Sequence, residues 1–158
     1  MGMHLKMNIR LANKFDVKQV IDLIHKFQEA NKLPESFMQE LDDEYLNKLF
    51  HHLILGAGVV YVAEVDTNIV GMIIGLKSSS PWFPNQITLK ELMLYTIKEY
   101  EGKGIGSKLL KAYNDKAKEL LENKDISLYA VSITKDLGKL NYEKYGYKKI
   151  EETWAIGL

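Results

Sequence analysis

The sequence predicts an α/β (α+β) fold in which a mixed, mostly antiparallel central sheet is flanked by about four helices. Three observations carry this prediction: short apolar stretches of strand length, two amphipathic stretches with helical spacing near the start, and a glycine-rich turn that joins a strand to a long helix. The expected order is βααβββαβαβ. The 158 residues contain no repeat and no Pro/Gly/Ser-rich linker, so we expect one domain over residues 1–158.

The first part of the chain predicts one strand and two helices. Alternating apolar residues indicate a half-buried strand: Leu5, Met7, Ile9 and Leu11. We expect Asp16 to cap a helix whose apolar residues share one face: Val17, Val20, Ile21, Ile24 and Phe27. A second helix should begin at Asp42 and end at the glycines of 56–58. Its inward residues should be Leu46, Leu49, Phe50 and Leu53.

The centre of the chain predicts a β-hairpin and a further strand. The apolar stretches 59–65 and 69–77 flank the short turn 66–68, whose residue types suit a hairpin. The loop 78–85 follows, and the apolar stretch 89–97 predicts the next strand.

The last third predicts four elements. A helix should run from Gly104 to about Asn123, followed by a strand over 126–132. A short helix over 136–145 and a final strand over 147–156 complete the order.

The most informative segment is the turn before the long helix. Glycines occupy every second position there: Gly102, Gly104 and Gly106. Without Cβ atoms, successive backbone N–H groups can surround one bulky anion at a helix N-terminus. Lysines follow with no acidic residue before Asn114: Lys103, Lys108 and Lys111. This pattern predicts a pyrophosphate site, although a tight strand-to-helix turn is the alternative, and the spacing fits neither a P-loop nor a dinucleotide fingerprint.

Composition excludes several classes of function. The chain has no cysteine, which excludes disulfide scaffolds, cysteine zinc sites and a thiol nucleophile. Lys+Arg and Asp+Glu both number 21, so no global field favours nucleic acid or a membrane surface as partner. No run of about 18 apolar residues or signal peptide is found, and we expect a cytoplasmic protein. The four histidines lack metal-ligand spacing, and no metal is expected.

Three segments resemble one family in its own order. The strand 89–97 followed by Glu101-x-x-Gly104-x-Gly106 and a helix resembles motif A of the GNAT superfamily of acyl-CoA-dependent N-acetyltransferases. Residues 142–147, Tyr-Glu-Lys-Tyr-Gly-Tyr, are similar to its motif B, and residues 59–75 to its hairpin. The loop around Trp82 and the Gly-Tyr-Lys-Lys-Ile-Glu-Glu ending resemble phage-encoded members.

The resemblance implies an enzyme that moves an acetyl group from acetyl-CoA to a primary amine by direct attack in a ternary complex. It implies that coenzyme A is held by motif A residues: Glu101, Gly102, Lys103, Gly104, Ile105, Gly106, Ser107 and Lys108. It also implies that the pantetheine arm pairs with the end of the fourth strand: Tyr95, Thr96 and Ile97. Glu101 stands where the family usually has Gln or Arg, and it can pair outward with a lysine or weaken coenzyme binding. This departure keeps open a non-catalytic acyl-CoA-binding or protein-interaction module of the same fold.

Two residues are the candidates for proton transfer. Tyr142 occupies the motif B tyrosine position, which implies a general acid for the departing thiolate; the alternative is a packed core tyrosine. Glu91 is the candidate general base, and the alternatives are a solvated strand residue, a register that puts Lys90 there, or a water relay.

The acceptor is expected to be a small-molecule or peptide amine. The acidic segment 28–43 and the aromatic loop 80–84 border the acceptor site in the family, and acidic residues would suit a cationic amine. A solvated helix cap and a hydrophobic plug are the alternative interpretations of these two segments. A homodimer is left open.

Overall fold

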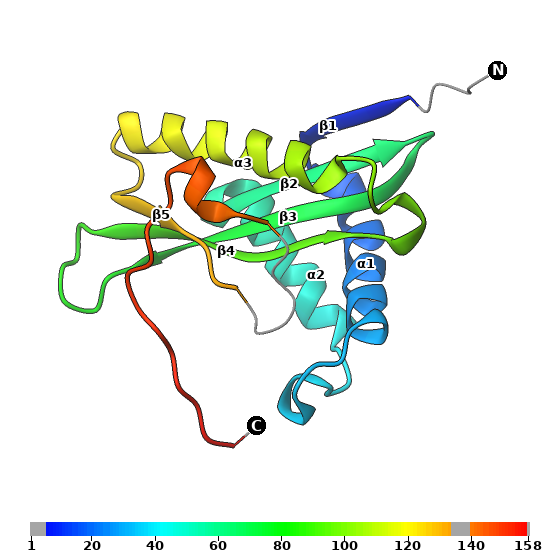
Figure 1. Ribbon diagram of the computed structural model, residues 1–158, viewed down its shortest axis with the longest axis horizontal. Coiled ribbons are helices and arrows are strands. Elements are labelled where there is room, and N and C mark those ends of the chain that lie inside the picture. Colours follow the sequence, from blue (N-terminus) through cyan, green and yellow to red (C-terminus); the bar gives the residue numbers. More distant parts are fainter. Residues whose placement is uncertain (1–5, 134–139, 158) are drawn as a thin grey trace.

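The computed structural model describes residues 6–133 and 140–157, and five strands form one sheet in the order β1-β2-β3-β4-β5 (Figure 1). The strands are β1 (Met7–Leu11), β2 (Gly58–Val65), β3 (Asn68–Ser79), β4 (Ile87–Thr96) and β5 (Leu128–Ala130). Neighbours from β1 to β4 are antiparallel, and β5 is parallel to β4. The predicted mixed, mostly antiparallel sheet is confirmed.

Helices cover both faces of the sheet. The helices α1 (Val17–Ala30) and α2 (Asp43–His52) pack on one face, and α3 (Ile105–Glu122) packs on the other (Figure 1). A hydrophobic core lies on each face of the sheet, and alternate residues of β2 and β3 belong to one or the other. Val60 and Met72 face α1 and α2, whereas Val59 and Ile73 face α3. Within the described residues there are three α-helices rather than about four, and none is both long enough and apolar enough to cross a membrane.

The hairpin between β2 and β3 forms as predicted. Asp66 and Thr67 have φ values of 48° and 71°, which is the left-handed pair that matches the twist of two antiparallel strands. Asp42 also caps α2, because its side chain accepts a hydrogen bond from the Tyr45 N–H at 3.0 Å. A short π-helical turn, Leu53–Ala57, follows α2 and leads into β2.

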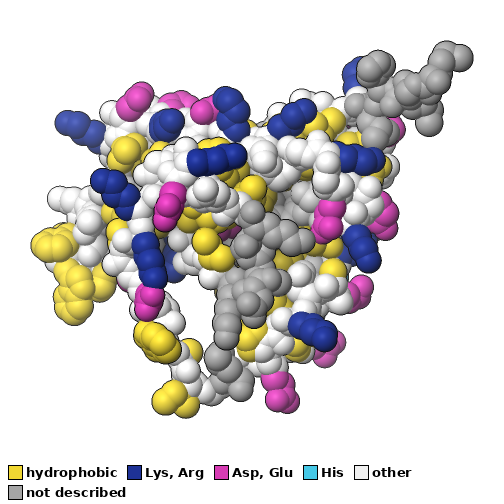
Figure 2. Space-filling model, viewed as in Figure 1, with side chains coloured by type: hydrophobic (Ala, Val, Ile, Leu, Met, Phe, Trp, Pro, Cys, Tyr) yellow, Lys and Arg dark blue, Asp and Glu magenta, His cyan; other side chains and the backbone are white. Residues whose placement is uncertain are grey.

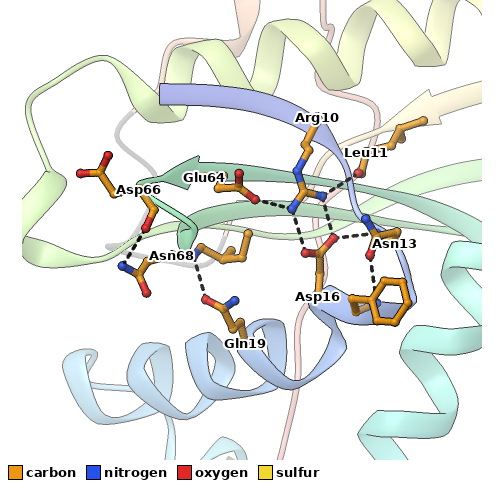
Figure 3. Close-up of polar contacts among 10 residues, drawn as sticks. Arg10, Leu11, Asn13, Asp16, Gln19, Glu64, Asp66 and Asn68 are labelled. Carbon is orange, nitrogen blue, oxygen red and sulfur yellow. Dashed lines mark hydrogen bonds and ion pairs between the residues drawn. The ribbon is translucent and has the colours of Figure 1, made fainter. Parts of the chain in front are cut away.

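Asp16 does not cap α1, contrary to the prediction. Its carboxylate accepts two hydrogen bonds from the Arg10 guanidinium at 2.7 and 2.9 Å, as Figure 3 shows. Arg10 also donates to Glu64 at 2.5 Å. Arg10 holds the pKa of Asp16 below its usual range, and the two charge-assisted bonds outweigh a single cap contact. Instead Asn13 caps the short 3-10 turn Lys14–Asp16 that precedes α1.

The C-terminal part departs most from the prediction. The prediction of a strand over 147–156 is wrong. Residues 148–157 are exposed, form no strand, and leave the body of the molecule after the 3-10 turn η5 (Tyr142–Tyr145) (Figure 1). Their apolar side chains are left in solvent: Ile150, Trp154 and Ile156. Of the helix over 136–145, residues 136–139 lie outside the described part, and Tyr142–Tyr145 form a 3-10 turn, η5. The strand expected over 126–132 shortens to β5 because it finds only three partners on β4.

The feature that positions the site is the separation of β4 from β5. The two strands pair only through Thr88, Leu89 and Lys90 of β4. A β-bulge follows at once, because Gly75 of β3 pairs with Glu91 and the next residue, Ile74, pairs with Met93. From Glu91 onward, none of the described residues pairs with β4 on its β5 side, and this part of β4 is called the free edge below.

Candidate active site

The N-terminus of α3 is a glycine-rich turn that is open to solvent. Gly102 and Gly104 have φ values of 76° and 78°, so both adopt the left-handed conformation that favours glycine. No side chain caps α3, and its first turn contains no acidic residue. A Cβ atom added to Gly106, inside that turn, would meet no described atom within 4 Å. The backbone N–H groups thus face open space and fit a pyrophosphate group.

A groove of about 530 Å³ lies between α3 and η5, next to this helix N-terminus. Its lining carries four lysines and one aspartate: Ser107, Lys108, Lys111, Asn114, Asp115, Lys118, Lys144 and Tyr145. Figure 2 shows the basic side chains along the same side of the molecule as α3. The predicted residues Ser107 and Lys108 line this groove. Lys111 belongs to the lysine pattern that predicts the pyrophosphate site, whereas sequence reasoning missed Lys118 and Lys144, although Lys118 follows Lys108 and Lys111 at the spacing of one helix face.

The other predicted motif A residues surround the helix start. Glu101 and Lys103 are exposed, and the Lys103 ammonium nitrogen lies 5.1 Å from the centre of the Tyr100 ring. Ile105 instead points into the α3 core and is 3% exposed, so its side chain anchors the turn and only its backbone faces the site. No described residue forms an ion pair with Glu101, so the outward lysine pair is not found.

Side chains at the end of β4 pack against the cores on both faces of the sheet. Tyr95, Thr96 and Ile97 are half-buried and lie beyond the last residue that pairs with β5. The Ile97 N–H donates to the Val70 carbonyl at 2.9 Å, which leaves this donor unavailable to a ligand. The Tyr95 ring lies on the face of the sheet that α1 and α2 cover. There it packs edge-to-face against Phe27 of α1, with 5.5 Å between the ring centres.

Acidic side chains surround Tyr95. Burial, and then the carboxylates of Glu101, Glu99 and Glu29, raise the pKa of the Tyr95 phenol. These three carboxylates come from the end of α1 and the turn after β4, so they form an acidic rim beside the Phe27–Tyr95 pair. Other acids of the 28–43 segment have local partners: Asp42 caps α2, and Asp43 contacts His25 at 2.7 Å. Trp82 and Phe83 of the aromatic loop are exposed.

Glu91 lies inside the molecule. It is 5% exposed and shares the α3 face of β4 with Leu89, whereas Lys90 is exposed. The interpretation of Glu91 as a solvated strand residue is therefore wrong, and Lys90 does not occupy the interior position. Burial raises the pKa of Glu91 to about 7.

Tyr142 is the first residue of η5, and the charge of Glu91 acts on its phenol. It is half-buried, packs against the α3 core, and meets the ring of Tyr147 edge-to-face at 5.7 Å. Tyr147 in turn donates to Asn114 of α3 at 2.5 Å, which ties this segment to the helix. Burial, and then the charge of Glu91, raise the pKa of Tyr142. The two predicted catalytic residues thus share one environment, and Tyr142 also packs in the core.

Metal-binding groups are not part of this arrangement. Across residues 6–133 and 140–157, no three side chains among His, Cys, Asp and Glu gather as a metal site would require.

The comparisons identify the family. Residues 56–149 match the acetyltransferase (GNAT) domain family. The chain belongs to this family. It is a GNAT-type N-acetyltransferase, for which acetyl-CoA is the acetyl donor. Membership favours the enzyme over a non-catalytic module of the same fold. None of the curated proteins matches the sequence.

Solved structures share the fold. A predicted acetyltransferase from Clostridium acetobutylicum, crystallised with acetyl-CoA, has a TM-score of 0.71 and 22% identity, covering 96% of both chains. A ribosomal-protein-alanine N-acetyltransferase from Brucella melitensis has a TM-score of 0.68 and 22% identity, covering 96% of this chain and 99% of the other. An aminoglycoside acetyltransferase from an uncultured soil sample has a TM-score of 0.67 and 21% identity, covering 96% and 94%.

Proposed function

We propose that the chain, as one domain over residues 1–158, transfers the acetyl group of acetyl-CoA to the primary amine of a small cationic acceptor by direct attack in a ternary complex. The observation that carries the proposal is that a buried carboxyl group, Glu91, and a half-buried phenol, Tyr142, lie near enough for the charge of Glu91 to raise the pKa of Tyr142, at the point where β4 separates from β5. A base and an acid are the two groups that this reaction needs from the protein.

The residues around α3 suit the coenzyme. Backbone N–H groups of residues 102–107 would bind the pyrophosphate, and Lys108, Lys111 and Lys144 in the adjoining groove would add charge-assisted contacts to phosphate oxygens. The free edge of β4 after Glu91 offers backbone groups to the amides of the pantetheine arm. When bound, the coenzyme supplies an activated acetyl thioester.

Glu91 and Tyr142 would carry the protons. A carboxyl group with a pKa of about 7 is about half ionised at neutral pH and can accept the proton of an attacking amine. The Tyr142 hydroxyl would donate its proton to the departing thiolate. One turnover then leaves Glu91 with one proton more and Tyr142 with one fewer, so transfer between these neighbours, or through solvent, restores both.

The acidic rim points to the class of acceptor. The carboxylates of Glu29, Glu99 and Glu101 lie beside the Phe27–Tyr95 pair at the end of β4. Three carboxylates attract a cationic amine, and the two rings offer it an apolar wall. Fold neighbours that are an aminoglycoside acetyltransferase and a glucosamine-6-phosphate N-acetyltransferase support a small-molecule amine.

A screen for CoA release tests the proposal. Polyamines, aminoglycosides, amino acids and peptide amines are offered with acetyl-CoA, and we expect turnover with one or more cationic amines. Glu91→Gln should then lower kcat by about 10²–10⁴-fold. The matched control is Lys90→Gln, because Lys90 lies one residue away on the exposed face. Equal rates for the two variants would contradict the role of Glu91.

A further inference from the structure

A buried hydroxyl group lies under the sheet without a hydrogen-bond partner. Tyr113 of α3 is 0% exposed, and its Oη atom has no partner among the described residues. A Cβ atom placed on Gly75 of β3 would lie 2.3 Å from this oxygen. The hydroxyl group therefore occupies the space that a side chain at position 75 would fill, and only glycine leaves that space open.

This space faces Glu91. Gly75 pairs directly with Glu91 across β3 and β4. Side-chain positions opposite each other on one face of an antiparallel pair lie about 5 Å apart. The Tyr113 hydroxyl group therefore lies within several ångströms of the Glu91 side chain without a hydrogen bond to it, and burial and then the charge of Glu91 raise the pKa of Tyr113.

The surroundings of Glu91 contain few groups that can stabilise its charge. Burial alone accounts for its raised pKa, with no contribution from a lysine, an arginine or a hydrogen bond of the described residues. The titratable groups that act on it are phenols: Tyr113 from α3, Tyr142 from η5, and Tyr147, two residues after the end of η5. On β3, Gly75 stands directly opposite Glu91, and the half-buried Lys77 follows on the same face, where it pairs with Leu89. Tyr147 already donates to Asn114, Tyr142 is only half-buried, and Tyr113 is fully buried with no hydrogen-bond partner among the described residues.

We propose that Tyr113 is a positioning residue whose hydroxyl group donates a hydrogen bond to Glu91 when this side chain ionises. The inference rests on the proposed role of Glu91 as general base. A hydrogen bond to a carboxylate is stronger than one to the neutral acid, so the donor favours the form that can accept a proton. The hydroxyl group fits in the space that the missing side chain of Gly75 leaves open. In the proposed arrangement Tyr113 touches neither acceptor nor coenzyme.

The test is a carbon-13 NMR titration of the Glu91 carboxyl group in the free protein, with Tyr113→Phe as the variant. We expect the titration midpoint to rise by about one pH unit, because loss of a hydrogen bond to a charged group corresponds to roughly that amount. The acid limb of the kcat/KM profile should move upward by the same amount. Tyr61→Phe is the control, because Tyr61 is a half-buried tyrosine on β2, which is two strands away from Glu91 on β4. An unchanged or lowered midpoint in Tyr113→Phe would overturn the inference.

A second measurement does not depend on the folding of that variant. In the wild-type protein the ring carbon that bears the Tyr113 hydroxyl group should change its chemical shift with the midpoint of Glu91, and this change should vanish in Glu91→Gln. No change at that midpoint would also overturn the inference.

The two proposals fail in different ways. If Glu91→Gln abolishes turnover but Tyr113→Phe leaves the midpoint unchanged, Glu91 remains the base and the role of Tyr113 is refuted. If the midpoint moves but Glu91→Gln retains full activity, the hydrogen bond is supported and the base role is refuted.

Discussion

Replacing Gly106 by leucine should stabilise the free protein and yet remove its response to acetyl-CoA. Gly106 is the second residue of α3, and an added Cβ atom would meet no described atom within 4 Å. Its backbone is not in the left-handed region, so leucine can adopt it without strain. A helical glycine costs about 0.8–1 kcal/mol relative to alanine and leucine costs little, but a first-turn position realises only part of this. We expect a gain of about 0.5 kcal/mol, or about 1–2 °C in Tm.

The same substitution should reduce the stabilisation that acetyl-CoA gives to the protein. Acetyl-CoA at 100 times its Kd should stabilise the wild-type protein by about 2.7 kcal/mol, which is roughly 5–11 °C for a chain of this size. In Gly106→Leu the side chain occupies the space proposed for the pyrophosphate, and we expect the shift to fall below about 2 °C. Thermal melts with and without coenzyme measure both effects, and far-UV circular dichroism checks the fold.

Two further glycines serve as controls. Gly104→Leu should also lose the coenzyme response, but its left-handed backbone should lower the Tm of the free protein. Gly56→Leu, with φ at 126° and far from α3 in the chain, should lower the Tm while the coenzyme response is retained. A full coenzyme shift in Gly106→Leu would refute binding at the start of α3.

Three other predictions follow from the charges of the site. Glu101→Gln should tighten acetyl-CoA binding by about 2- to 5-fold, because a solvent-screened like charge near the phosphates is removed; calorimetry that finds equal affinity at low and high salt would show that Glu101 points away. The pKa of Glu91 is about 7 in the folded protein and about 4.3 when unfolded, so its contribution to stability is present below about pH 4.3 and lost as the pH rises through 7. Melts from pH 5 to pH 8 should therefore favour Glu91→Gln increasingly over the wild type, and a constant difference would argue against a buried neutral acid. Tyr142→Phe should lower kcat by about 10²–10⁴-fold with an unchanged acetyl-CoA shift, whereas near-normal kcat with a lower Tm would make Tyr142 a packing residue only.

Much of the fold was predictable because its signals are local. The turn at Asp66 and Thr67, the cap at Asp42 and the glycines before α3 each act within a few residues. The C-terminal strand failed because a strand needs a neighbour, and β5 is only three residues long. Asp16 failed as a cap because its partner, Arg10, belongs to β1.

The candidate site was predictable in part. The residues proposed to bind the pyrophosphate form one contiguous segment, 102–107, so the sequence alone suggests them. The bulge after Glu91 turns Tyr95 to the opposite face of the sheet, and the continuous apolar run 92–95 gives no alternation that would locate this bulge. The contact between Tyr113 and Gly75 requires the packing of α3 on β3, and no sequence pattern signals it.

A crystal structure of the acetyl-CoA complex tests the central claim most directly. The pyrophosphate should contact backbone N–H groups of residues 102–107, and the thioester should lie where β4 separates from β5, within hydrogen-bond reach of Tyr142 and on the side of Glu91. A thioester on the opposite face, beside Met93 and Tyr95, with Glu91 and Tyr142 out of reach, would contradict the account.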